Sequence, residues 1–312
     1  MKSIQLSIFT LVAVSVLTGC QPKQEAALPE VKSDDFRTYT AEEFYKTTSV
    51  LGSSINHDNT AVLVSSDETG IFNAYRVPLD GSEKTALTAS TAESIYVNSW
   101  FPNDDRILYN ADQGGDELDH VYVRNIDGSV IDLTPGENLK ASFVDWHEGG
   151  KQFFVTTNER DPKYFDLYKY QISDYSRELV YENISGYEIG DISSNGRWLA
   201  LIKAHSNSDS DIFLIDLNSD DQTSIMVAGS APQDVALGVY TFTPDNQKLI
   251  YASNADGEFN QAMSYNLKSQ THSLSYAADW DVSFSYFSED GKYRVTGINK
   301  DAQTVLDIVD TA

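Results

Sequence analysis

A repeat of about 45 residues runs through most of the 312-residue chain and constrains its fold more than any other feature. A turn that opens an apolar strand occurs six times, with turn residues Asn59, Asp105, Gly150, Gly196, Asn246 and Gly291. The spacings between them are 46, 45, 46, 50 and 45 residues. A second series, on the strand that follows, comprises Tyr75, Tyr122, Tyr168, Phe213, Met263 and Leu306. Two series that advance together indicate one structural unit copied along the chain.

Each unit can be divided into four short strands. In the first unit, Ala61 to Ser65 is an apolar run, Asn73 to Leu79 returns as a strand, and a last short strand ends near Leu87-Thr88. Asp80-Gly81 between them is a residue pair that tight hairpins favour. Four short antiparallel strands in every 40–45 residues predict an all-β fold, a β-propeller of four-stranded blades.

The number of blades follows from the same spacing. Five units are complete, and the sixth ends after its third strand at Asp310-Thr311-Ala312. We expect seven blades in the full protein, and we interpret this chain as its N-terminal part. The first strand of each blade should line the central channel. These strands are expected near residues 50–56, 95–101, 140–146, 186–192, 237–243 and 282–287.

The N-terminus has the pattern of an export signal. An apolar stretch from Ile4 to Leu17 follows Lys2, and it is too short for a membrane span but suits a signal peptide. Leu17-Thr18-Gly19-Cys20 resembles the bacterial lipobox, which implies cleavage before Cys20 and lipid attachment to its sulfur. Gln21 after the cysteine implies the outer membrane if the source is Gram-negative. We therefore expect an exported lipoprotein of the cell envelope that a lipid anchor holds on the membrane.

The predicted organisation has three parts. Residues 1–19 are the lipoprotein signal peptide, residues 20–35 are the lipidated cysteine and a flexible tether, and residues 36–312 are the propeller, incomplete at its C-terminus. Thr40 and Glu43 form a capping-box pattern, which predicts one short helix over residues 41–47.

The charge of the chain excludes one class of partner. Lys and Arg number 22 and Asp and Glu number 47, so the formal net charge is 22 − 47 = −25. Nucleic acid needs clustered Lys and Arg for its phosphates, so we expect no nucleic-acid partner.

Several sequence stretches resemble known families of propeller proteins. The units PNDDRILYNA and EDGKYRVTG resemble the propeller repeats of TolB and, equally, the N-terminal propellers of prolyl oligopeptidase family serine peptidases. Residues 65–81 (SSDETGIFNAYRVPLDG) and 110–128 (NADQGGDELDHVYVRNIDG) look like the first two blades of exported dipeptidyl-peptidase and acylaminoacyl-peptidase relatives. The resemblance implies a propeller that caps an α/β-hydrolase domain and restricts access to short peptides, while a Ser-Asp-His triad in the hydrolase does the chemistry.

The chain departs from that family at the catalytic motif. No G-x-S-x-G pattern occurs in the 312 residues, and the nearest fragment, Gly52-Ser53-Ser54, has Asn56 where the second Gly is needed. No catalytic residue of that family can therefore be assigned in this chain, and we expect the chain as written to be inactive. The expected function is the substrate-gating portion of a lipid-anchored peptidase whose hydrolase domain is absent here. The alternative is a non-enzymatic, TolB-like envelope propeller that binds protein partners.

Few other residues indicate a site. The five His residues are scattered without a metal-binding spacing, and the acids of residues 112–119 lack the calcium-loop framework, so we expect no metal and no cofactor. The same hairpin offers Asp116 and Glu117 as candidates for binding the amino terminus of a peptide, as acidic residues do on the propellers of dipeptidyl peptidases. Solvated hairpin acids are the alternative.

Overall fold

The structure is a computed structural model that describes residues 37–229 and 234–311. The segment before Thr48 contains one helix, α1 (Ala41–Tyr45). Its capping box is present, because Thr40 Oγ1 accepts a hydrogen bond from Glu43 N at 3.1 Å and Thr40 N donates to Glu43 Oε2 at 3.1 Å. The predicted helix is confirmed, although it ends two residues earlier than expected.

The unit that begins at Thr48 consists of antiparallel sheets. The first two are β1 (Val50–Ile55), β2 (Ala61–Ser66), β3 (Asn73–Pro78), β4 (Thr85–Ala86), and β5 (Tyr96–Trp100), β6 (Ile107–Ala111), β7 (His120–Arg124), β8 (Val130–Asp132). The next two are β9 (Ala141–Trp146), β10 (Gln152–Asp161), β11 (Tyr164–Gln171), β12 (Arg177–Tyr181), and β13 (Glu188–Ile192), β14 (Trp198–Ser206), β15 (Asp209–Asp216), β16 (Ile225–Ala228). The last two are β17 (Leu237–Phe242), β18 (Lys248–Ser253), β19 (Gln261–Asn266), β20 (His272–Tyr276), and β21 (Asp281–Phe287), β22 (Tyr293–Lys300), β23 (Gln303–Asp310).

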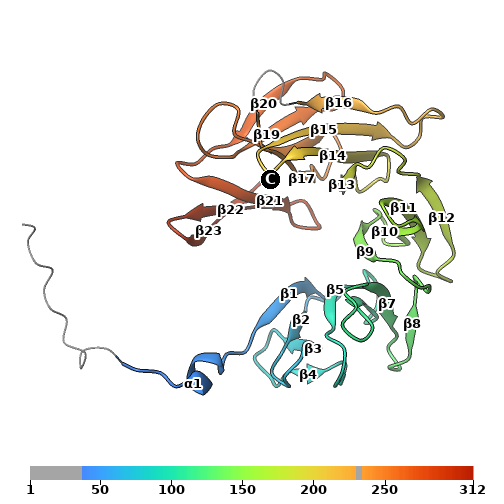
Figure 1. Ribbon diagram of the computed structural model, residues 1–312, viewed down its shortest axis with the longest axis vertical. Coiled ribbons are helices and arrows are strands. Elements are labelled where there is room, and N and C mark those ends of the chain that lie inside the picture. Colours follow the sequence, from blue (N-terminus) through green and yellow to red (C-terminus); the bar gives the residue numbers. More distant parts are fainter. Residues whose placement is uncertain (1–36, 230–233, 312) are drawn as a thin grey trace, which may run out of the picture. The chain divides into compact units, whose positions relative to one another are not determined.

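Each sheet keeps its strands in chain order, so every sheet is one blade of a propeller. Within this unit the first strands, such as β1, β9 and β13, face the middle, and the fourth strands, such as β4 and β12, lie outside (Figure 1). Most consecutive blades contact each other through their first strands, such as β1 with β5, β13 with β17, and β17 with β21, whereas blades 2 and 3 contact through β7 and β9. Five blades have four strands and the sixth has three among the described residues, which confirms the predicted β-propeller.

The turn between the first two strands of a blade explains the repeat. Five of these turns carry a residue in the left-handed region, with φ of 58° at Asn59, 60° at Gly150, 69° at Gly196, 54° at Asn246 and 70° at Gly291. Gly has no Cβ to clash there, and Asn tolerates this region better than most residues. The repeat therefore spaces Gly and Asn at about 45 residues because each turn needs this conformation.

Two predicted landmarks were wrong by one residue. In the second blade the backbone hydrogen bond from Phe101 N to Arg106 O makes Asp104, and not Asp105, the equivalent of Asn59, and neither Asp has a positive φ. The Asp104 side chain accepts from Arg106 N at 3.0 Å and closes this turn differently. In the sixth blade Leu306 pairs with Gly297, one residue out of step, because residues 301 and 302 form a tight two-residue turn.

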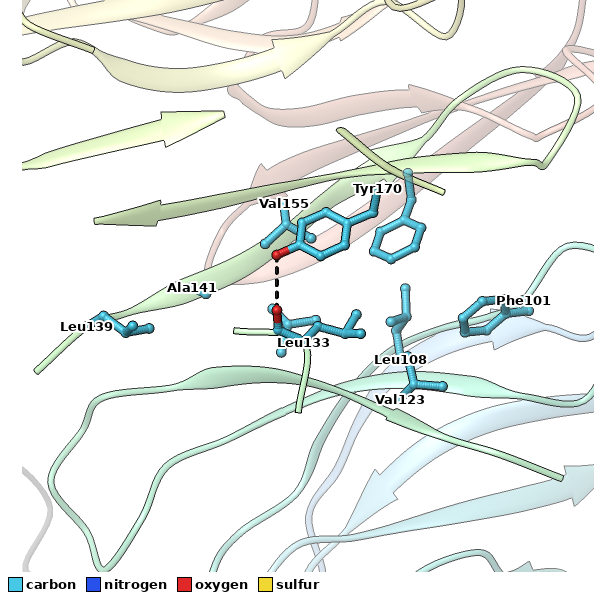
Figure 2. Packing of buried hydrophobic residues seen from close by; sticks show 10 residues of the cluster. Phe101, Leu108, Val123, Leu133, Leu139, Ala141, Val155 and Tyr170 are labelled. Carbon is cyan, nitrogen blue, oxygen red and sulfur yellow. Dashed lines mark hydrogen bonds between the residues drawn. The ribbon is translucent and has the colours of Figure 1, made fainter. Parts of the chain in front are cut away.

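A separate apolar cluster fills each junction between neighbouring blades. Between blades 2 and 3, Phe101, Leu108 and Val123 pack against Phe153 and Tyr170. Figure 2 shows this packing, and Tyr170 also donates a hydrogen bond from its hydroxyl to Leu133 O at 3.1 Å. The aromatic residues thus serve the blade junctions, where their large side chains fill the space between sheets.

Candidate functional site at the ends of the first strands

One position of the repeat lies beside the junction with the next blade, and three of its five side chains bond to that blade. It lies two residues before the turn and is occupied, from blade 1 to blade 5, by Ser54, Ser99, Asp145, Asp191 and Thr241. We call these the seam residues. Ser54 Oγ accepts a hydrogen bond from Trp100 N of blade 2 at 3.2 Å, and Asp191 Oδ2 accepts one from Phe242 N of blade 5 at 3.0 Å. In both places a side-chain oxygen on one blade satisfies a backbone N–H on the next.

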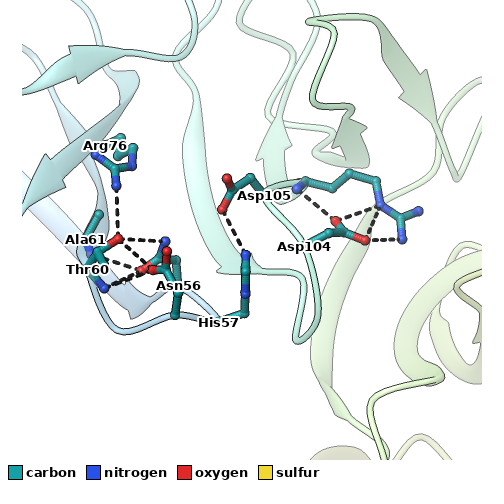
Figure 3. A network of polar contacts seen from close by, with 9 residues as sticks. Asn56, His57, Thr60, Ala61, Arg76, Asp104 and Asp105 are labelled. Carbon is teal, nitrogen blue, oxygen red and sulfur yellow. Dashed lines mark hydrogen bonds and ion pairs between the residues drawn. The ribbon is translucent and has the colours of Figure 1, made fainter.

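The turns beside the seam residues are also connected from blade to blade. In blade 1, Asn56 Oδ1 accepts from Thr60 N at 3.0 Å and from Ala61 N at 2.9 Å, which fixes the turn. His57 Nε2 then lies 3.5 Å from Asp105 Oδ1 of blade 2, as Figure 3 shows. Farther on, Glu148 N donates to Ser194 O at 2.7 Å between blades 3 and 4. This end of the propeller is therefore held together by polar contacts.

A cavity of about 470 Å³ opens at this end, beside the last residues of β9, β13, β17 and β21. Its walls include the aromatic residues Trp146, Phe242 and Phe287. The charged residues that line it are acids: Asp145, Glu148, Asp191 and Glu289. No Lys or Arg is among the described residues of the lining, so negative charge dominates this cavity.

Three seam residues line the cavity, and two of them, Asp145 and Asp191, have a carboxyl group that can carry a charge. Asp191 Oδ1 accepts from Ile192 N at 2.9 Å, in addition to the bond from Phe242. Asp145 Oδ1 accepts from Trp146 N at 2.7 Å. Burial raises the pKa of Asp145 to about 6, and the carboxylate of Glu289 adds to the rise. Burial raises the pKa of Asp191 to about 7, and the nearby Asp145 contributes.

A larger hollow of about 650 Å³ lies between β17 and β21 and has a different character. Its single carboxylate is Asp281, whose Oδ1 accepts from Asn260 N at 2.8 Å. The rest of its described lining is uncharged and includes aliphatic, amide, hydroxyl and aromatic side chains, among them Leu237, Asn299, Ser283 and Tyr286. We therefore take the acidic cavity as the candidate site, because it combines a hollow with pKa values displaced toward neutrality.

Asp116 and Glu117 lie elsewhere, in the exposed hairpin between β6 and β7. Asp116 Oδ1 accepts from Leu118 N at 3.0 Å and from Gln113 N at 3.3 Å, and the bond from Leu118 lowers the pKa of Asp116. Glu117 N donates to Asp112 Oδ2 at 3.2 Å. Part of the hairpin's negative charge is thus used to close the hairpin on itself. A role for Asp116 and Glu117 in peptide binding stays a prediction.

The His residues have local partners that account for their positions. His120 Nδ1 lies 2.9 Å from Asp132 Oδ2, and His205 Nε2 lies 2.9 Å from Asp211 Oδ2. His272 Nδ1 contacts the hydroxyl of Tyr251 at 2.9 Å. Across residues 37–229 and 234–311, no group of three or more His, Cys, Asp or Glu side chains is placed to hold a metal ion.

Cys20, the predicted lipid attachment site, lies outside the described residues. In the part of the chain that the structure describes, no helix is long and apolar enough to cross a membrane.

The order of the strands and the packing of successive blades define the chain as a β-propeller protein with a polar, acidic opening at one end. No protein-family model matches the chain. A stretch of 126 residues is 33% identical to dipeptidyl aminopeptidase BIII of Pseudoxanthomonas mexicana and covers 38% of this chain and 18% of that relative. The predicted relationship to a dipeptidyl aminopeptidase is therefore confirmed in sequence, over a small part of the relative's length.

Solved structures agree on the fold. The chain matches a prolyl endopeptidase structure with a TM-score of 0.64 at 11% identity, covering 85% of this chain and 42% of the other. It matches an oligogalacturonate lyase solved with manganese with a TM-score of 0.65 at 13% identity, covering 84% and 76%. At such low identity these matches show the propeller fold and carry no activity with them.

Proposed function

We propose that this chain is the propeller portion of a lipid-anchored serine peptidase that acts on short peptides. The observation that carries the proposal is the 33% identity to dipeptidyl aminopeptidase BIII. The match is in sequence, whereas the fold alone is shared with a lyase and so does not distinguish activities. In this role the propeller restricts access by size, and a hydrolase domain supplies the nucleophile, since the 312 residues contain no G-x-S-x-G.

The acidic cavity supports a role in handling peptides. A peptide carries a protonated amine at its N-terminus, and basic side chains add further positive charge. An opening lined by four carboxylates attracts such groups and repels anionic ones. The net charge of −25 means that the chain as a whole also attracts cationic groups and repels anionic ones.

The decisive experiment reads the coding frame around this sequence and assays the complete product. We expect a G-x-S-x-G in the remaining sequence, followed by Asp and His, and hydrolysis of chromogenic dipeptides by the product. A variant with Ala at that Ser is the control and should be inactive. A complete product without a hydrolase domain, or one that leaves the dipeptides intact, would contradict the proposal and favour a propeller that only binds partners.

The anchor is a separate part of the proposal and rests on the tetrad Leu17-Thr18-Gly19-Cys20. Several acyl chains on Cys20 would hold the protein at a membrane, since each buried CH₂ contributes ~0.8 kcal/mol. Residues 21–35 would then act as a tether with a reach of roughly 20 Å. Membrane association through the lipid would therefore need no basic surface. This fits a chain in which Asp and Glu outnumber Lys and Arg by 47 to 22.

A further inference from the structure

The larger hollow, between β17 and β21, owes part of its lining to an irregularity in the first strand of blade 6. The pairing of β21 with β22 shifts between Val282 and Phe284, which makes Ser283 an extra residue. A strand alternates its side chains between two faces, and one extra residue reverses the alternation. Asp281, Phe284 and Tyr286 therefore share one face, since their partners on β22 are two residues apart. The bulge brings a carboxylate and two aromatic rings together.

The two rings form a platform whose position is fixed by a glycine. Phe284 lies over Gly297 of β22, where an added Cβ would come within 2.3 Å of the ring. The rings of Phe284 and Tyr286 stack with their centroids 6.0 Å apart and their planes inclined by 25°. Tyr286 remains 49% exposed. The hollow therefore has an aromatic wall against which a flat or ring-shaped ligand can lie.

Two polar side chains of the same hollow have unused hydrogen-bonding capacity. Asn260, directly before β19, has a buried Oδ1 with no hydrogen-bond partner among the described residues. Its backbone is held firmly, because Asn260 N donates to Asp281 Oδ1 at 2.8 Å and Asn260 O accepts from Val282 N at 2.9 Å. Asp281 Oδ2 accepts no hydrogen bond from a described residue. A buried amide oxygen without a donor is costly, so this oxygen is positioned for a ligand or a water molecule.

The repeat shows how another blade uses the position of Asn260. Three residues before the third-strand landmark, blade 4 has Ser210 where blade 5 has Asn260. Ser210 Oγ donates to Leu237 O at 2.8 Å and accepts from Leu237 N at 2.9 Å, so blade 4 uses this side chain to hold the next blade. Asn260 makes the corresponding connection with its backbone. The Asn260 side chain is therefore not needed to join the blades.

We propose that this hollow binds a neutral saccharide, with a sugar ring on Tyr286 and sugar hydroxyl groups bonded to Asn260 and Asp281. A hydroxyl group both donates and accepts hydrogen bonds, which suits a lining of carboxylate, amide and Ser side chains. The C–H face of a pyranose ring is apolar and packs on an exposed aromatic ring. The proposal does not depend on the peptidase role, because the site lies within the propeller and needs no hydrolase domain.

The charge of the lining favours this class of ligand over two others. Asp281 is the one charged residue of the described lining, and no Lys or Arg accompanies it. An anionic ligand would meet repulsion without a compensating cation. A cationic amine finds four carboxylates in the acidic cavity and one carboxylate here, so it favours the other site. A neutral ligand with several hydroxyl groups fits this hollow best.

Isothermal titration calorimetry of the full chain with cellotetraose and chitotetraose tests the proposal. We expect at least one of these neutral sugars to bind, and tetragalacturonate to bind at least about tenfold more weakly because it is anionic. Asn260→Ala and Tyr286→Ala should each weaken the binding of the neutral sugar at least about tenfold, since each removes a direct contact with it. Absence of binding of both neutral sugars at about 5 mM would overturn the proposal.

Thermal unfolding of the same variants separates binding from folding. Asn260→Ala should leave the thermal midpoint of the free chain unchanged, because Asn260 Oδ1 bonds to no described residue. The matched control is Asn207→Ala, at an exposed amide in the turn between β14 and β15, and it should bind the sugar as the wild type does. A lower midpoint with unchanged affinity in Asn260→Ala would make this amide structural and the proposal wrong. Loss of binding to trialanine, and not to a sugar, in that variant would identify a peptide site and equally overturn it.

Discussion

Arg160 and Asp166 show how a single ion pair can organise a whole hairpin. Arg160 Nε and Nη2 donate to the two oxygens of Asp166 at 2.6 and 2.8 Å, and Nη2 also donates to Asn183 O at 3.0 Å. Asp166 is fully buried and accepts from Asn183 N at 2.8 Å. One carboxylate thus joins β10, β11 and the segment that leads to the next blade.

We expect Asp166→Ala to lower the free energy of unfolding by about 1–3 kcal/mol, because it leaves the buried N–H of Asn183 without its acceptor. Chemical denaturation followed by circular dichroism measures the change. The matched control is Glu182→Ala, since Glu182 contacts the same arginine at 3.6 Å from an exposed position and should cost less than about 1 kcal/mol. Equal changes in the free energy of unfolding for the two substitutions would show that the buried network stabilises the fold no more than the exposed ion pair does.

Cys20 has a prediction of its own, at the same scale. Cys20→Ser removes the sulfur to which a lipid would be attached, so the chain should no longer incorporate a labelled fatty acid. When cells are fractionated, the variant should be found in the soluble fraction and no longer in the membrane fraction. Full incorporation of label in the Ser variant would place the lipid elsewhere or exclude it.

At the scale of elements, the bulge in β13 lies where blades 4 and 5 approach each other closely. Gly190 lies at the bulge of β13, and a Cβ added there would come within 2.8 Å of the Cβ of Val239 on β17. Gly238, its neighbour across the junction, has room for a Cβ, with the nearest atom at 3.7 Å. Both glycines lie in first strands, but only at Gly190 does the neighbouring blade leave no room for a larger side chain.

This difference gives a paired prediction. Gly190→Ala should destabilise the chain by about 1–3 kcal/mol, because the inserted methyl group forces blades 4 and 5 apart. Gly238→Ala should be neutral or stabilise by up to about 1 kcal/mol, because alanine restricts the unfolded chain more than glycine does. Thermal unfolding of both variants measures the contrast, and similar losses in both would argue against a close contact at Gly190.

Sequence patterns predicted the elements better than the site. Gly and Asn at left-handed turns mark the repeat, and they located the first strands to within two residues. Asp145 and Asp191 were missed because 46 residues separate them in the sequence, and nothing local distinguishes them from other acids. Aligning the seam position of the repeats would have found them, since they are the two acids at a position that elsewhere holds the hydroxyl residues Ser54, Ser99 and Thr241. Their raised pKa values depend on burial, which needs the structure.

At the scale of the whole molecule, the net charge of −25 opposes compaction. Surface carboxylates repel each other over a Debye length of about 10 Å at 0.1 M salt, and added salt screens this repulsion. We therefore expect the thermal midpoint to rise when sodium chloride increases from about 0.02 to about 0.2 M. Choline chloride at equal ionic strength should give the same rise, which excludes a specific sodium site. A falling midpoint would mean that the ion pairs outweigh the repulsion.

The separate apolar cluster at each blade junction has a consequence for biosynthesis. Every described blade is one contiguous run of the chain, and the main contacts between blades join neighbours in sequence, such as β1 with β5 and β17 with β21. Contacts of this kind become available as soon as two successive blades have emerged from the ribosome or a translocation pore. Vectorial synthesis can therefore assemble the propeller blade by blade, with each new sheet folding against the face that the previous one presents.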